Sequence, residues 1–334
     1  MGHVTLNLPW LQLRSRDLPE ALTAQLSRAL AKFAGGHGAV GILLDVSMTA
    51  DNTGEPDVAR AIAGAANVQF QFVHGVERAD AAQYATPDGS VASLDFASGR
   101  LRLALNAQVF DAPYSTWSDL LAAPLSAAWR HHGFYPLHAA AVSFDDGCAP
   151  LVIGASGAGK TTTSLALLQG GARWRADDKV LLHARAGTII ATSLYANTNL
   201  APATIAAHDG LRFALARPPI NETNDKRPCL LTEVTAAVDL SPFAPTALLF
   251  PSRVPKAESA LRPLGELDVL LRLSAQSPMS ADRARVRRQH EQLVALARLL
   301  PAWEVEAGTD VLHAPDAFAE RVHRTLADTM AAAR

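Results

Sequence analysis

The chain has 334 residues, with 32 Asp and Glu against 30 Lys and Arg, so its formal net charge is −2. This near-neutral balance gives no electrostatic reason to expect nucleic acid as a partner. The two cysteines, Cys148 and Cys229, do not make a disulfide framework and are typical of a reducing cytoplasm. We find no signal peptide and no apolar run near the roughly 20 residues that span a bilayer, so we expect a cytoplasmic protein without a membrane partner.

Residues 1–133 predict a small, β-rich α+β domain. Val4 to Leu13 alternates apolar and polar residues, which indicates a strand. Asp17-x-x-Glu20 resembles a capping box at the start of a helix, and Val40 to Val46 predicts a buried strand. From Val68 to Phe110 apolar residues recur at every second position between turn signals, which predicts an antiparallel meander. Because this region shows no catalytic constellation, we expect an accessory domain, with acceptor binding as the alternative.

An amphipathic helix is predicted from Thr116 to His131. The polar end Arg130-His131-His132 is interpreted as cations that favour a helix C-terminus, because thiol or acid partners for a metal are missing nearby. A strand is then predicted from His138 to Phe144, followed by a hairpin turn at Asp145-Asp146-Gly147. The returning strand, Ala149 to Ile153, leads directly into a glycine-rich segment.

The pattern Gly154-x-x-x-x-Gly159-Lys160-Thr161 matches the P-loop, in which a glycine-rich turn joins a strand to a helix. The apolar run Leu151–Ile153 predicts that strand, and Thr162–Gln169 predicts that helix. Glycines let backbone N–H groups turn inward as an anion nest, to which the helix adds its positive end. We expect Lys160 to reach the β- and γ-phosphates of ATP and Thr161 to ligate Mg²⁺. The expected nucleotide-binding residues are Gly154, Ala155, Ser156, Gly157, Ala158, Gly159, Lys160, Thr161 and Thr162.

Arg173 to Leu182 predicts a strand that carries the adjacent acids Asp177 and Asp178. Neighbouring side chains on a strand point to opposite faces, but the end of a strand can splay them toward one site. Beside a P-loop, one acid would hold Mg²⁺ and the other would orient or deprotonate an acceptor hydroxyl. A polar strand end or a helix cap is the alternative without chemistry.

Further along the chain, Thr188–Ser193 and Ala247–Phe250 predict strands, and residues 195–235 predict loops with short helices. Phosphoryl transfer spreads negative charge over oxygens that a nearby Lys or Arg stabilises. The candidates for this role are Lys226, Arg227 and Arg253, with ordinary solvated charges as the alternative.

A long helix is predicted from Ser280 to Leu300, and Trp303 to Glu306 predicts a final strand. The first half of that helix is rich in arginine. We expect a solvated face there, with docking of an acidic partner as the alternative. The arginines concerned are Arg283, Arg285, Arg287 and Arg288.

Three motifs follow one another: LHAAAV at Leu137–Val142, GASGAGKTT at Gly154–Thr162 and ADDKV at Ala176–Val180. In order and spacing they resemble the C-terminal domain of HPr kinase/phosphorylase, and still more the HPr-kinase-related proteins of bacterial gene clusters, including those that phosphorylate lasso-peptide precursors. The loop also resembles that of phosphoenolpyruvate carboxykinase. The resemblance implies that Asp177 is the base and Asp178 the metal-associated acid. It also implies that His138 lies near the phosphates.

We therefore predict an α/β chain in which residues 134–334 form a P-loop domain of the HPr kinase and phosphoenolpyruvate carboxykinase type, preceded by the smaller β-rich domain. The expected function is an ATP- and Mg²⁺-dependent kinase acting on a Ser or Thr hydroxyl of a peptide or protein, in keeping with peptide natural-product maturation. A kinase of small metabolites and a nucleotide-binding regulator with little catalysis are the alternatives. The resemblance also implies a homo-oligomer, since HPr kinases assemble.

Overall fold

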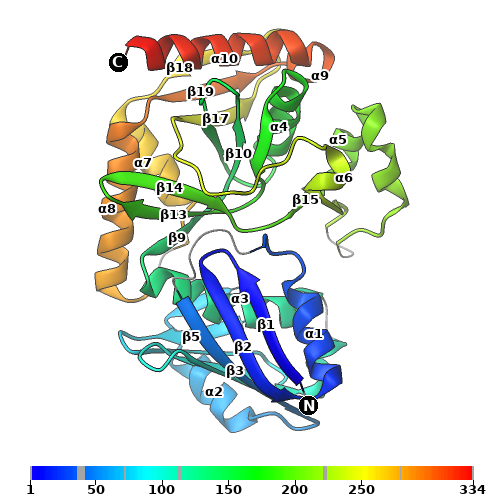
Figure 1. The fold of residues 1–334 in the computed structure, drawn as a ribbon, viewed down its shortest axis with the longest axis vertical. Coiled ribbons are helices and arrows are strands. Elements are labelled where there is room, and N and C mark those ends of the chain that lie inside the picture. Colours follow the sequence, from blue (N-terminus) through cyan, green and yellow to red (C-terminus); the bar gives the residue numbers. More distant parts are fainter. Residues whose placement is uncertain are drawn as a thin grey trace. The chain divides into compact units, whose positions relative to one another are not determined.

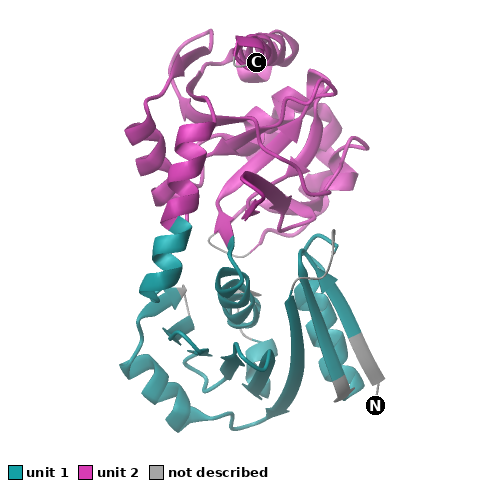
Figure 2. Ribbon diagram, turned by 60° about the vertical axis from the view of Figure 1, so that its left-hand side comes forward, with its two compact units in different colours: residues 1–134, 279–289 teal, residues 135–278, 290–334 magenta. Residues whose placement is uncertain are grey.

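The computed structural model describes residues 2–35, 42–70, 73–111, 114–220, 224–278 and 280–332. The fold is mixed α/β with several sheets. The chain divides into two compact units (Figure 2): Met1–Phe134 with Met279–Gln289, and Tyr135–Pro278 with His290–Arg334. The predicted division after residue 133 did not include the return of 279–289 to the first unit. Among the described helices, none is both long and apolar enough to cross a membrane.

The first unit contains one eight-stranded sheet in the order β1-β2-β3-β8-β7-β6-β5-β4. Strands β4 to β8 form the predicted antiparallel meander, which is confirmed, whereas β2–β3 and β3–β8 pair in parallel. Its elements are β1 (Gly2–Leu8), β2 (Leu11–Leu18), α1 (Glu20–Leu30), β3 (Ile42–Asp51), α2 (Pro56–Gly64), β4 (Val68–Phe70), β5 (Val73–Glu77), β6 (Ala81–Ala85), β7 (Val91–Asp95), β8 (Arg100–Asn106), the 3-10 helix η1 (Ala107–Phe110) and α3 (Tyr114–His131).

Three predictions for the start of the chain were wrong or incomplete. Val4 to Leu13 is a hairpin rather than one strand, because β1 and β2 pair antiparallel through a two-residue turn that includes Trp10. Across this turn the apolar positions shift from even (Leu6, Leu8) to odd (Leu11, Leu13), and the prediction of one strand missed this change of phase. Among the side chains that the structure describes, none caps α1, whose N-cap is Pro19. Strand β3 alternates in burial and runs beyond Val46, while Val40 lies outside the described residues.

Two arginines are buried in the first unit: Arg130, at the end of the predicted helix, and Arg285, from the cluster predicted to be a solvated face. Arg130 forms an ion pair with Glu77, and neither side chain is accessible to solvent. Glu77 also accepts hydrogen bonds from Tyr84 Oη (2.7 Å) and Ser280 Oγ (2.6 Å). Arg285 donates to two backbone carbonyls between β5 and β6, at 2.9 and 2.7 Å. Charged groups are buried only with partners, and these partners are distant in sequence, so the local pattern could not predict the burial.

The second unit is built on a six-stranded sheet in the order β12-β10-β11-β17-β19-β18, with a three-stranded sheet β14-β13-β9 and a two-stranded sheet β15-β16 (Figure 1). Strand β9 and helix α8 cross the division between the units. The elements are β9 (Phe134–Leu137), β10 (Ala139–Ser143), β11 (Pro150–Ile153), α4 (Lys160–Gln169), β12 (Arg173–Ala176), β13 (Val180–Arg185), β14 (Thr188–Ser193), β15 (Asn197–Leu200), α5 (Pro202–Ala206), the 3-10 helix η2 (Asp209–Ala216), β16 (Arg227–Leu230), α6 (Leu231–Val234), β17 (Ala247–Arg253), β18 (Ala260–Pro263), α7 (Glu266–Ala275), α8 (Arg283–Leu299), β19 (Ala302–Ala307), α9 (Asp310–His313) and α10 (Pro315–Ala332).

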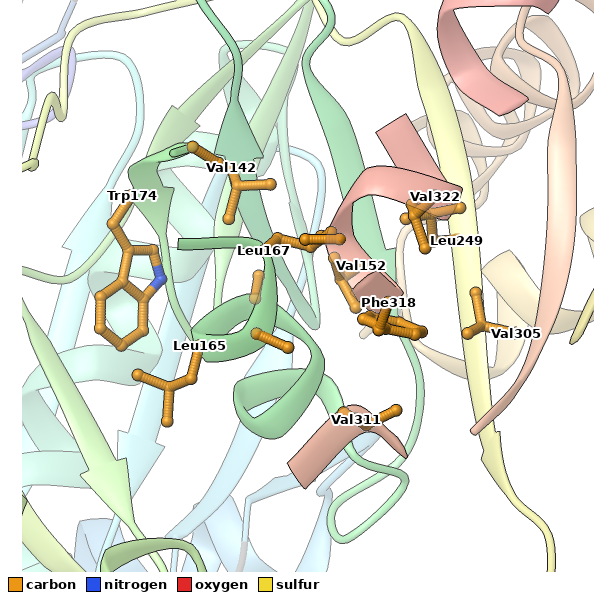
Figure 3. Packing of buried hydrophobic residues seen from close by; sticks show 14 of the residues in the cluster. Val142, Val152, Leu165, Leu167, Trp174, Leu249, Val305, Val311, Phe318 and Val322 are labelled. Atoms are coloured by element: carbon orange, nitrogen blue, oxygen red, sulfur yellow. The ribbon is translucent and has the colours of Figure 1, made fainter. Parts of the chain in front are cut away.

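Both faces of the six-stranded sheet are covered, which explains why its central strands are apolar without alternation. In β11, Val152 packs in a core with α4 and α10, whereas its neighbours Leu151 and Ile153 pack in a second core with α7 and α8. Figure 3 shows Val152 with Phe318 and Val322 of α10 in the first core. The sheet is therefore a rigid layer whose edges can hold loops in place.

Most strands and helices predicted for this unit are confirmed, including Thr188–Ser193 and the hairpin of β10 and β11. The strand predicted from Arg173 to Leu182 is wrong. It is two strands in different sheets, β12 and β13, separated by residues 177–179. Asp178 has a φ of 65°, which turns the chain there. A left-handed residue leaves no mark on an apolar pattern when it is not glycine.

Candidate functional site

Strand directions bring four chain segments to one edge of the six-stranded sheet. Strand β11 is parallel to β17, and β10 is antiparallel to both β11 and β12. The carboxyl ends of β11, β12 and β17 therefore meet the start of β10 at the same edge. The residues next to these ends are Gly154, Asp177, Arg253 and His138. In open α/β sheets this edge is where ligands bind.

The glycine-rich segment joins β11 to α4, so the predicted strand and helix are confirmed. Gly157 and Gly159 have φ values of 82° and 105°, which strain any side chain with a Cβ. Gly154 has an ordinary φ, but a Cβ there would stand 2.9 Å from the Cβ of Ala158. The backbone thus requires glycine at positions 157 and 159, and the close approach of Ala158 requires it at 154. Gly159 forms the N-cap of α4. The positive end of α4 faces the loop.

Lys160 folds back over this loop. Its Nζ donates to the carbonyl oxygens of Gly154 (2.8 Å) and Ala155 (3.2 Å). The residue is only 8% exposed. Burial lowers the pKa of Lys160, against the opposing charges of Asp178 and Asp177. An ammonium group held this way is positioned to exchange carbonyl contacts for an anion at the loop.

Asp177 is the more deeply buried of the two acids, at 3% exposure. Thr198 Oγ1 donates to its Oδ2 at 2.5 Å, and Thr161 Oγ1 approaches its Oδ1 at 3.4 Å. Burial raises the pKa of Asp177 to about 6, helped by the charge of Asp178 and opposed by the hydrogen bond from Thr198. The carboxyl group therefore titrates close to neutrality.

Asp178 is ionised under the same conditions, although it is the next residue. Partial burial would raise its pKa, but a hydrogen bond from His138 and the charges of Lys179, His138 and Lys160 lower the pKa to about 2. His138 Nε2 lies 3.2 Å from Asp178 Oδ1. The other ring nitrogen lies 3.2 Å from Gln276 Oε1, which fixes the orientation of the imidazole. The two acids thus differ in pKa because their surroundings differ.

One cavity, about 600 Å³ including its open mouth, receives most of the predicted residues. Arg227 does not line it and donates instead to the Asp225 carbonyl at 2.9 Å. Lys226 lines it and reaches Ser156 Oγ at 3.5 Å. Of the loop, Gly154, Ala155 and Ala158 do not line it. The predicted residues that do are His138, Ser156, Gly157, Gly159, Lys160, Thr161, Thr162, Asp177, Asp178, Lys226 and Arg253.

Sequence reasoning did not single out the residues that β15, α5 and the position between them contribute. Asn199, Ala201 and Thr204 line the cavity, and the Thr198 hydroxyl donates a hydrogen bond to Asp177. Their segment was recognised only as rich in Asn, Pro and Thr. No spacing pattern links a short strand to acids about 20 residues earlier, so the contact could not be predicted.

The side chains of the cavity fit a magnesium ion that is shared with a phosphate ligand. Mg²⁺ prefers hard oxygen ligands and is usually held by one or two carboxylates together with substrate phosphates. Asp177, Asp178 and the Thr161 hydroxyl offer such oxygens at one wall. Across the described ranges, no group of three or more His, Cys, Asp and Glu residues forms a dedicated metal cage.

The second unit is thus an α/β unit that carries a glycine-rich loop, two acids and a histidine at the carboxyl edge of its sheet. No protein-family model matches the chain, and no curated protein matches it. Among solved structures, it is similar to the Hpr(Ser) kinase/phosphatase from Coxiella burnetii, with 14% identity and a TM-score of 0.30. That similarity covers 58% of this chain and 97% of the other. We therefore base the functional proposal on the residues of the cavity.

Proposed function

We propose that this protein is a phosphotransferase that moves the γ-phosphoryl group of ATP to a hydroxyl group. One observation carries the proposal: a single cavity combines a glycine-rich loop with two adjacent carboxyl groups whose pKa values are shifted in opposite directions. Such a pair is typical of acid–base chemistry. The loop and Lys160 supply the charges that hold phosphates.

In the proposed reaction, the acceptor hydroxyl oxygen forms a bond to the γ-phosphorus and the bond to the β,γ-bridging oxygen breaks. The proton passes to Asp177, and ADP leaves. A base with a pKa near 6 accepts such a proton at neutral pH. Asp178, kept ionised by His138, serves with Thr161 as the metal-associated acid. Bound Mg²⁺ would neutralise charge on the phosphate oxygens.

Lys226 and Arg253 are proposed to stabilise negative charge that develops on the transferred group. Both line the same cavity as the acids. Arg227 is assigned no such role, since its guanidinium bonds to its own turn.

The acceptor is proposed to be a Ser or Thr hydroxyl of a peptide or protein, on the strength of the three motifs that resemble HPr-kinase-related proteins. A small-metabolite acceptor uses the same chemistry. The two kinds of acceptor are distinguished by whether the transferred phosphate is found on a macromolecule or on a small molecule.

The test is transfer from γ-labelled ATP with Mg²⁺ in lysate of the native source, with macromolecular and small-molecule fractions counted separately. Asp177→Asn should bind ATP and transfer no label. Asp268→Asn, an exposed acid on α7, is the matched control and should transfer like wild type. Label on a peptide or protein supports the full proposal, whereas label on a small molecule redirects the acceptor. Full transfer by Asp177→Asn would remove Asp177 from the mechanism.

The division of work between the acids has its own test, because Asp177 also approaches Thr161 on the expected metal side. Asp178→Asn should raise the Mg²⁺ concentration needed for half-maximal transfer, and Asp177→Asn should not be rescued by added Mg²⁺. The reverse pattern would exchange the two roles.

A further inference from the structure

A second cavity adjoins the first along the same edge of the sheet. It measures about 730 Å³ with its open mouth, which is within the range of roughly 300–1,000 Å³ typical of small-molecule sites. The two cavities share four wall residues: Gly159, Thr162, Thr204 and Arg253. A ligand can therefore extend from one cavity into the other across the N-terminus of α4.

The walls of this cavity, called here the β19 cavity, differ from those of the first. Val254, Ala307, Val311 and Leu312 supply aliphatic surface. In the described residues, Arg253 is the one charged side chain that lines it. The aliphatic residues come from the carboxyl ends of β17 and β19 and from α9. An apolar slot beside an anion-binding loop suits a flat, weakly polar group attached to phosphates.

The order of the strands gives the direction of such a ligand. Strand β12 carries the acids, β11 leads into the loop, and β19 ends at the apolar cavity, in the order β12-β10-β11-β17-β19. The loop therefore lies between the acids and the β19 cavity. In a nucleotide-dependent transfer, the γ-phosphate must face the acceptor, so the nucleoside must lie on the other side of the phosphates.

We propose that the β19 cavity binds the nucleoside part of the nucleotide, an inference that rests on the proposed function. The base lies against Val254, Val311 and Leu312. Arg253 stands where the two cavities join, and its side chain has no hydrogen bond or ion pair with the described residues. This cation is available to the phosphate chain where the ligand passes from one cavity into the other.

The hydrogen bonds of the walls indicate how the base is recognised. The backbone N–H of Val254 donates to Ala307 O (3.0 Å), and that of Gly308 donates to Ser259 Oγ (2.9 Å). The N–H groups of Thr309 and Leu312 are also bonded internally. None of these four donors remains to read the edge of a purine. With these four donors occupied, we expect the base to be recognised mainly by contact with the aliphatic walls, which discriminates weakly between similar ligands. ATP and GTP should therefore bind within about tenfold of each other.

The experiment is calorimetric titration of the full chain with ATP, GTP and inorganic tripolyphosphate, each with Mg²⁺. Tripolyphosphate reports the loop alone, because it lacks a nucleoside. Wild type should bind ATP at least about tenfold more tightly than tripolyphosphate. Leu312→Ala should weaken ATP binding by about tenfold and leave tripolyphosphate binding unchanged. Val254→Trp, which fills the cavity, should do the same. Leu267→Ala, a matched change at a site 68% exposed on α7, should alter neither.

Each contrary result has a distinct meaning. Equal binding of ATP and tripolyphosphate by wild type, or equal loss of both in Leu312→Ala and Val254→Trp while each variant stays folded by circular dichroism, would overturn the nucleoside site and leave the proposed function standing. A preference of more than about a hundredfold for one purine would overturn the mode of base recognition. Failure of wild type to bind any of the three ligands would overturn the proposed function, and the inference with it.

Discussion

Asp177 and Asp178 are neighbours in the sequence, yet one titrates near pH 6 and the other near 2. The difference arises because the backbone turns between two sheets at this point. At this turn, Asp177 is buried and accepts a hydrogen bond from Thr198, whereas Asp178 lies beside His138. A continuous strand would have placed them on opposite faces, so the break in the strand is what allows both to line one cavity.

The left-handed backbone at Asp178 supports a residue-scale prediction. Its φ of 65° is tolerated by Asp and Asn and is costly for β-branched residues. Asp178→Val should therefore lower the free energy of unfolding by about 1–3 kcal/mol more than Asp178→Asn. Both variants lose the ion pair with His138, so their difference isolates the backbone. Urea unfolding measures it, and equal midpoints would show that the turn carries no strain.

At the scale of elements, the glycine after α4 sets how closely that helix packs. A Cβ at Gly170 would stand 2.3 Å from the Cβ of Ala319 on α10. The close approach lets α4, which begins at the loop, be held by the core that includes Phe318 and Val322. The position of the loop thus depends on a contact at the opposite end of its helix.

Gly170→Ala should accordingly separate α4 from α10 and lower the free energy of unfolding by about 1–3 kcal/mol. Gly210→Ala is the matched control, because a Cβ there meets no atom within 4 Å and the φ of Gly210 is not positive. Its unfolding midpoint should stay close to that of wild type. If the two variants unfold at the same urea concentration, the α4–α10 contact is not tight in solution.

At the scale of the whole molecule, each unit has its own core, and the first unit includes a chain segment that follows most of the second. Ser280 and Arg285 belong to that segment and bond to the first unit near Glu77 and the β5–β6 turn. His131 lies beside them, with its Nδ1 3.2 Å from Arg285 Nη2 and its ring stacked on Phe96 at 4.3 Å. The imidazole is thus held neutral beside a permanent cation.

This arrangement predicts a pH dependence of the first unit. Burial lowers the pKa of His131 to about 4, and the charges of Arg285, His132 and Arg288 act in the same direction against Asp282. The unfolded chain, with an ordinary pKa near 6.5, binds more protons below that value. The contribution of His131 to the free energy of unfolding is therefore complete above pH 6.5 and is lost as pH falls toward 4. Urea midpoints at pH 7 and 5 should differ less in His131→Gln than in wild type, and an unchanged difference would contradict the assignment.

A cytoplasmic location and a homo-oligomer stay predictions at this scale. Both cysteines are free and buried, and burial raises the pKa of the Cys148 thiol to about 11. Such a thiol is unreactive at neutral pH.

The sequence by itself determined the local structures in which neighbours along the chain decide the backbone. The loop from Gly154 to Lys160 is one, because glycine positions and the flanking apolar run act within a few residues. The meander and the strand at Thr188–Ser193 are others. Only the tertiary structure decided which residues meet. His138, Asp177, Thr198 and Arg253 lie in or next to different strands, and their meeting depends on strand order and direction. The burial of Glu77 with Arg130 also depends on packing. A buried charge needs a partner, and this partner lies 53 residues away, so a local sequence pattern cannot predict the pair.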